Sequence, residues 1–137
     1  MADEHELIVE THIPINFTKA TGFAVEQGAI LKLTSPMTAV VGSADGDPCA
    51  GVVHTEVTAA EASASVSLYR GGIFRATAGV AGVTVGECIQ MDANTSPVNR
   101  LVDCDAGSEQ MVGVCLETAS NGVRFLYELR PFSVDQA

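Results

Sequence analysis

The chain has 137 residues, of which 47% are hydrophobic, 18% charged and 5% aromatic, and its formal net charge is −10. This composition indicates one folded domain, and it lacks both the apolar run of a membrane span and the clustered Lys and Arg residues that binding to nucleic acid requires.

The first 17 residues are predicted to form an extended arm. Residues 1–6 are acidic, lack the positive region of an export signal and are expected to fray. Pro14 excludes a helix and a central strand position, while the alternation of apolar positions after it is typical of an edge strand. Two interpretations remain open: an edge strand packed on its own barrel, or an arm that packs on a neighbouring subunit. The residues expected to make an intersubunit or partner contact are Leu7, Ile8, Val9, Ile13, Pro14, Ile15 and Phe17.

Residues 18–132 are predicted to form a single β domain, followed by a C-terminal tail at 133–137. About nine or ten short apolar runs, separated by Gly, Pro and Asp turns, recur at the spacing of strands in a small barrel or sandwich. The only segment with helical character is residues 58–64. Strands are expected at residues 29–34, 37–42, 50–57, 65–70, 73–77 and 123–129.

Two local signals refine this pattern. Residues 65–70 and 73–77 alternate on either side of Gly71-Gly72, which predicts a β-hairpin. Arg130-Pro131 is predicted to end the last strand. The fold class is therefore all-β, as a small compact β-barrel or β-sandwich of β-tulip-like form.

An internal duplication relates residues 25–56 to residues 83–117. The separation between matching positions grows from 58 to 62 residues, as expected when strands are kept and loops vary. We expect the two copies to close one common core, with Val52 and Val114 buried in it. The matching pairs are Gly28 and Gly86, Pro36 and Pro97, Val41 and Val102, and Gly51 and Gly113.

No pattern of residues predicts catalysis, a cofactor or a metal. His5, His12 and His54 show no metal-ligand or triad spacing, and two of them lie in the arm. The acidic turns at residues 45–47 and 103–105 lack the further carboxylates of a calcium loop.

The four cysteines show no C-x-x-C spacing and are expected to be reduced and mostly buried. The alternative is a disulfide between Cys49 and Cys115, which occupy matching places in the two copies.

The chain resembles the small capsid cement, or head decoration, proteins of tailed phages from about Ile13 to Leu129. The similarity rests on the run 28–33 followed by Val40-Val41 and Gly51-Val52-Val53, then Met111-Val112-Gly113-Val114 and the closing strand at 123–129. It implies a non-catalytic domain on the outer surface of an icosahedral head. It further implies homotrimers, at three-fold or quasi-three-fold positions, that bridge major capsid proteins and stabilise the shell.

Two other functions compete with this one. A trimeric receptor-binding or adhesin module would use the same class of fold. An enzyme or carrier domain on a small barrel is less well supported, because neither Lys19 nor Lys32 lies in the tight hairpin that a carrier lysine needs.

Overall fold

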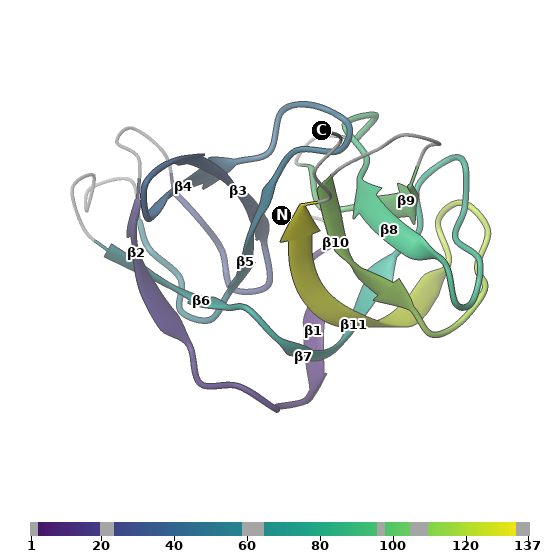
Figure 1. Cartoon of the computed structure of the whole chain (residues 1–137), viewed down its shortest axis with the longest axis horizontal. Coiled ribbons are helices and arrows are strands. Elements are labelled where there is room, and N and C mark those ends of the chain that lie inside the picture. The colour runs from purple at the N-terminus through teal and green to yellow at the C-terminus, as the bar shows by residue number, and fades with distance from the viewer. Residues whose placement is uncertain (1–2, 20–23, 59–64, 96–97, 105–109, 134–137) are drawn as a thin grey trace.

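The computed structural model describes residues 3–19, 24–58, 65–95, 98–104 and 110–133. Within these ranges the regular elements are all strands, which confirms the predicted all-β class (Figure 1). None of the described segments forms a helix that could cross a bilayer. The strands are Glu6–Val9 (β1), Ile15–Lys19 (β2), Ile30–Ser35 (β3), Thr38–Val41 (β4), Cys49–Val53 (β5), Ser65–Tyr69 (β6), Gly72–Thr77 (β7), Cys88–Met91 (β8), Leu101–Asp103 (β9), Gln110–Cys115 (β10) and Arg124–Ser133 (β11).

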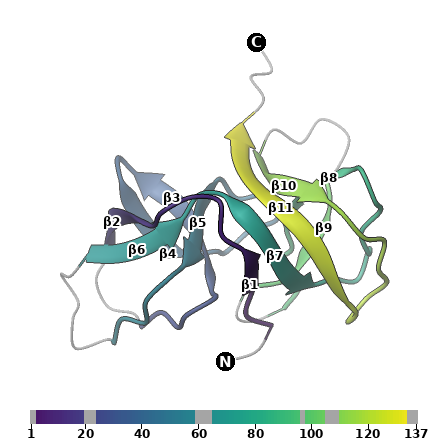
Figure 2. The same cartoon turned by 90° about the horizontal axis from the view of Figure 1, so that it is seen from below.

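The strands form two units that lie side by side. Strands β2, β4, β3, β5 and β6 close a small barrel, and β1, β7, β11, β10, β8 and β9 form a six-stranded sheet. Figure 1 shows the barrel on the left and the sheet on the right. Seen from below, β1 lies along the junction between the two units, so the N-terminal segment contacts both (Figure 2).

The predicted duplication is confirmed by the strand order. The barrel order β4-β3-β5-β6-β2 repeats in the sheet as β9-β8-β10-β11-β7, and among the described strands β1 alone has no counterpart. The parallel pairing of β2 with β4 that closes the barrel has one remnant in the sheet, the parallel bridge between Ala78 and Leu101. The turns repeat as well: the Gly28 N–H donates to the Val53 carbonyl, as the Gly86 N–H does to that of Cys115.

The expectation of one shared core is wrong. The described residues form two apolar clusters, one inside the barrel and one inside the sheet. The sheet cluster also takes in Ile30, Cys49, Val52 and Tyr69, which point from the barrel toward the sheet. All five residues of β5 are consequently buried, because this strand has a core on each side.

The prediction for the two valines is correct for Val52 and wrong for Val114. Val52 is 1% exposed, whereas Val114 is only half-buried. Both copies have the same local irregularity, which skips Ala50 in β5 and Val112 in β10. Ala50 and Val112 lie in the core of their own unit, so Val52 and Val114 both point away from that core. Val52 is buried because it packs into the sheet cluster of the other unit, whereas Val114 remains half-buried.

The predicted hairpin across Gly71-Gly72 does not form. Both strands exist, but β6 pairs with β2 and β5 in the barrel, whereas β7 pairs with β1 and β11 in the sheet. The two glycines carry the chain from one unit to the other past the N-terminal segment. Gly72 has φ +124°, which favours glycine, whereas a Cβ on Gly71 would lie 2.2 Å from the ring of the exposed His12 side chain, which would have to move.

Strand β11 continues through Pro131 to Ser133, beyond its predicted end. This is tolerated because β7 pairs with β11 only as far as Leu129, and the register shift against β10 lies opposite Pro131. The expected helical turn at 58–64 lies, apart from Thr58, outside the described residues. The four cysteines are thiols, so Cys49 and Cys115 do not form the alternative disulfide.

Candidate functional site

The N-terminal segment carries a group of exposed aliphatic side chains. Ile8, Val9 and Ile15 are 43–45% exposed, and Ile13 is 81% exposed. We call these four side chains the arm surface. Leu7 and Pro14 are half-buried and Phe17 lies in the barrel core, so Phe17 is not available for contact with a partner in this fold.

The backbone of this segment is packed on its own chain. Strand β1 pairs with β7, and β2 pairs with β6 and β4, as the first of the two interpretations expects. Strand β1 is also an end strand of the sheet. Apolar side chains on an end strand are a feature that soluble domains normally avoid unless another chain covers them.

The expected fraying of residues 1–6 is wrong at His5, which is 4% exposed and anchors the segment. Its Nε2–H donates to the Asn99 carbonyl at 2.7 Å, and its Nδ1 accepts a hydrogen bond from the Tyr127 hydroxyl. A carbonyl can only accept, so Nε2 carries a proton. Burial lowers the pKa of His5 to about 4, so near neutral pH the ring is uncharged and its Nδ1 is the acceptor. The His5 backbone N–H donates to the Gly28 carbonyl at 2.7 Å, which ties the segment to the barrel as well.

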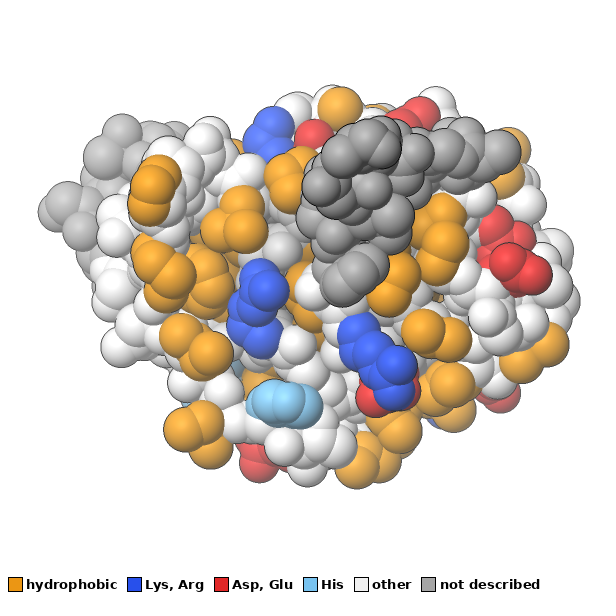
Figure 3. All heavy atoms as spheres, in the orientation of Figure 1, with side chains coloured by type: hydrophobic (Ala, Val, Ile, Leu, Met, Phe, Trp, Pro, Cys, Tyr) orange, Lys and Arg blue, Asp and Glu red, His pale blue; other side chains and the backbone are white. Residues whose placement is uncertain are grey.

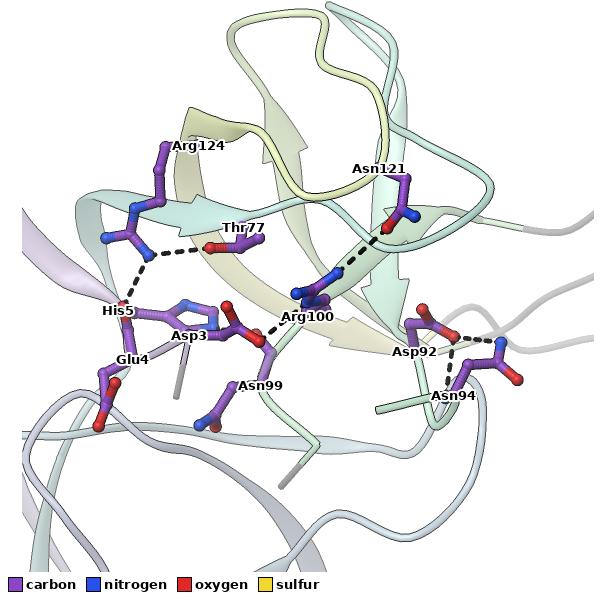
Figure 4. A network of polar contacts seen from close by, with 10 residues as sticks. All are labelled: Asp3, Glu4, His5, Thr77, Asp92, Asn94, Asn99, Arg100, Asn121 and Arg124. Atoms are coloured by element: carbon purple, nitrogen blue, oxygen red, sulfur yellow. Dashed lines mark hydrogen bonds and ion pairs between the residues drawn. The ribbon is translucent and has the colours of Figure 1, made fainter. Parts of the chain in front are cut away.

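Two arginines hold the residues on either side of this anchor (Figure 4). The Arg100 Nε–H donates to the Asp3 carboxylate at 2.8 Å, and Arg124 donates to the Glu4 carbonyl at 3.0 Å and to Thr77 Oγ1 at 3.1 Å. Both arginines belong to the sheet unit, and they bind the acidic N-terminal stretch that the sequence alone predicts to fray. The chain is therefore held in place immediately before the exposed residues of the arm surface.

The His5 contacts predict a pH dependence of stability. Burial lowers the pKa of His5 from 6.5 to about 4, against the opposing effect of its bond to the Asn99 carbonyl. The unfolded chain therefore binds more protons between these two values, so the free energy of unfolding falls as pH drops through this window, by about 3 kcal/mol in total. Urea unfolding of the wild type and of His5→Gln at pH 4 to 7.5 measures this effect.

In that experiment the free energy of unfolding of His5→Gln is expected not to show the fall of about 3 kcal/mol at low pH. The control variant His12→Gln changes an exposed position and is expected to show it. Parallel stability curves for the wild type and His5→Gln would contradict the role assigned to the buried ring.

A shallow apolar groove adjoins the arm surface on the barrel. Met37 is 51% exposed and adopts φ +50°, so the turn after Pro36 holds its side chain outward. Figure 3 shows hydrophobic side chains gathered over the barrel, with a basic side chain among them. Met37 is absent from the predicted contact residues, although an apolar residue in a Ser-Pro turn was a usable signal. The groove is lined by Ile15, Phe17, Leu33, Ser35, Pro36, Met37 and Arg70.

The carboxylates of the acidic turns bind groups of the protein itself. Asp47 accepts two backbone N–H groups of its turn, Asp45 accepts one from a neighbouring loop, and Asp103 accepts the N–H and hydroxyl of Thr84. Asp105 lies outside the described residues. Across the residues that the structure describes, no group of three or more His, Cys, Asp or Glu side chains could hold a metal ion.

A cleft of about 480 Å³ lies beside β1 at the junction of the two units. Its walls include His5, Tyr69, Phe74 and Arg124. Both ring nitrogens of His5 are bonded, and Arg124 is bound to backbone and Thr77, so neither is placed to act on a ligand as a base or an anion receptor. Residues 4–7 of the N-terminal segment form one wall of this cleft.

Comparison with known proteins agrees with the fold and the sequence resemblance. No curated protein sequence matches the chain. Among solved structures, the chain is similar to the head fiber gp8.5 N base in bacteriophage phi29, with a TM-score of 0.55 and 16% sequence identity over 90% of this chain and 100% of that one. At this identity the likeness concerns the fold. The family described as phage cement protein matches residues 9–129, which cover both units. The chain therefore belongs to the phage cement protein family and is a structural decoration protein of the capsid exterior.

Proposed function

We propose that the chain binds the major capsid protein through the arm surface, bridges neighbouring capsid subunits and stabilises the shell without catalysis. The observation that carries this proposal is the exposure of four aliphatic side chains between residues 8 and 15 in a protein with a net charge of −10. Fully burying an exposed aliphatic side chain contributes about 1.5–3 kcal/mol, so Ile13, at 81% exposed, can gain most of this against a partner, and Ile8, Val9 and Ile15, at 43–45%, about half.

Stabilisation follows from binding to the assembled lattice and not to separate subunits. A ligand that binds only one state shifts the equilibrium toward that state. On an icosahedral shell the same weak contact is repeated at every equivalent position, so modest individual affinities act together. The end strand β1 also offers backbone groups to which a capsid strand could add.

The family resemblance further leads us to propose a homotrimer at three-fold or quasi-three-fold positions. Size-exclusion chromatography with light scattering gives the mass in solution and on release from heads. A particle of three chains supports the proposal, and a monomer in both preparations contradicts it.

The capsid contact is tested by a single charge on the arm surface. Ile13→Asp is expected to weaken co-sedimentation with expanded heads by at least about tenfold, because a desolvated aliphatic contact becomes a buried charge. Val80→Asp is the control, since Val80 is 67% exposed and follows β7 in the sheet unit, outside the arm. Its affinity is expected to stay within about twofold of the wild type, as for most surface substitutions.

Equal effects of Ile13→Asp and Val80→Asp would contradict the role of the arm surface. Both variants should melt like the wild type, because both side chains are solvent-exposed, and this shared melting temperature shows that a loss of binding is not a loss of folding.

A further inference from the structure

Two of the four cysteines face each other across the edge of the sheet. Strands β8 and β9 pair in a continuous antiparallel register, Ile89 with Asp103, Gln90 with Val102 and Met91 with Leu101. One step further along the same register, Cys88 lies opposite Cys104, and the Cys104 N–H donates to the Cys88 carbonyl at 2.9 Å.

This placement suits a disulfide. Directly opposed residues in an antiparallel ladder point their side chains to the same face, with Cα atoms about 5.5 Å apart in hydrogen-bonded pairs. Disulfides span Cα separations of about 4.4–6.8 Å. The ladder therefore holds the two cysteines at a Cα separation that a disulfide can span, and closing the bond draws their Cβ atoms from the roughly 4.5–5.5 Å of opposed strand residues to about 3.5–4.5 Å.

This pair differs from the other two cysteines in its exposure to solvent. Cys88 and Cys104 are half-exposed, whereas Cys49 and Cys115 are buried. Burial raises the pKa of the Cys49 thiol to about 12 and also raises that of Cys115, which makes both poor nucleophiles. A small oxidant in solution therefore reaches Cys88 and Cys104 first.

The pair is not a requirement of the duplicated fold. In the first copy the position that matches Cys88 is Ile30, next to the Leu31–Val41 pair at the end of the β3–β4 ladder. The first copy thus has an aliphatic side chain at this position, while the second copy has a cysteine opposite another cysteine.

We propose that Cys88 and Cys104 form a cross-strand disulfide once the protein meets an oxidising medium. The oxidant is a low-molecular-weight disulfide such as oxidised glutathione. One thiolate attacks it, forming a mixed disulfide and releasing one small thiol; the second thiolate then attacks the protein-bound sulfur and releases the other. The two protein thiols lose two electrons and two protons, and the small disulfide is reduced to two thiols.

The bond ties the three-residue end strand β9 to β8 and closes the loop between them. This loop includes Asn99, whose carbonyl binds His5, so the bond also restrains the anchor of the N-terminal segment. The capsid exterior is the part of a virion that a change of medium reaches first.

The test compares reduced protein with protein incubated with oxidised glutathione, after which the remaining thiols are blocked with an alkylating reagent. Trypsin then cuts after Arg100, and a second cut after Glu109 separates Cys104 from Cys115. Oxidation is expected to consume two of the four thiols, to link the Cys88 and Cys104 peptides, and to raise Tm by about 10 °C.

Cys88→Ser and Cys104→Ser are each expected to abolish the linked peptide and the Tm shift, and Cys115→Ala is expected to keep the link. The proposal is overturned if oxidation leaves Cys88 and Cys104 alkylated, if it stops at glutathione adducts, or if it links either cysteine to Cys115 or to a second chain. Because oxidised and reduced wild type are compared directly, the result does not depend on the folding of any variant.

Discussion

Replacing Val52 with aspartate is expected to lower the free energy of unfolding by about 3–5 kcal/mol, because the carboxylate would be buried without a partner. Val52 is 1% exposed and belongs to the sheet cluster, although its strand is part of the barrel. It lies where the two units meet, so the charge replaces an apolar contact in the sheet cluster. A loss of this size removes a large part of the roughly 5–15 kcal/mol that stabilises a typical domain.

Val114→Asp is the matched control, since it places the same charge at the equivalent position of the second copy. Val114 is half-buried, and its carboxylate can turn to solvent, so we expect a loss of about 1 kcal/mol. Urea unfolding followed by circular dichroism measures both. Equal losses would contradict the division into two cores and favour the single shared core.

Replacing Gly113 with alanine is expected to cost more than about 3 kcal/mol, at the upper end for overpacking. A Cβ at this position would lie 1.9 Å from the carbonyl oxygen of Glu128, which belongs to the neighbouring strand β11. Backbone cannot move aside as a flexible side chain does, so the β10–β11 ladder would have to open. Gly51, the counterpart in the barrel, is restricted in the same way, because an added Cβ would lie 2.3 Å from the Tyr69 carbonyl oxygen.

Gly86→Ala is the control that separates the effect of this steric clash from the strain of placing a non-glycine residue at a glycine position. Gly86 has φ +85°, but no atom lies within 4 Å of an added Cβ. The strain of the left-handed backbone alone costs about 1–2 kcal/mol. Thermal melting of both variants should therefore place Gly113→Ala clearly below Gly86→Ala, and the reverse order would show that close strand approach is not what Gly113 provides.

The duplication was predictable because its glycines have local physical reasons. Gly28 and Gly86 take positive φ in equivalent turns, and Gly51 and Gly113 lie against the neighbouring strand, so these positions resist substitution while loops change in length. Their spacing is therefore visible in the sequence and translates directly into two equivalent sets of strands.

The errors arise where long-range contacts override local patterns. A two-glycine turn between alternating runs predicts a hairpin, but it contains no information about which partners each strand will choose. His5 is held by Asn99 and Tyr127, which are 94 and 122 residues away along the chain. Val52 and Val114 occupy matching positions, but Val52 packs into the sheet cluster of the other unit while Val114 stays half-buried, and this contact between units leaves no local signal in the sequence.

The candidate site was predicted in part. The arm sequence identified Ile8, Val9, Ile13 and Ile15, which are exposed, but it also included Phe17, which fills the barrel. Alternation placed Ile13, Ile15 and Phe17 on one face, and only the closed barrel determines that this face turns inward at Phe17. Met37 was missed although it follows the Ser35-Pro36 turn, a local signal of exposure that is visible in the sequence.

Electron cryo-microscopy of expanded heads reconstituted with this chain tests the proposed capsid contact most directly. We predict density for the two-unit domain on the outer face of the shell, with Ile8, Val9, Ile13 and Ile15 against the major capsid protein. Density that places these four side chains toward solvent, or a shell that stays bare at saturating protein, would contradict this prediction.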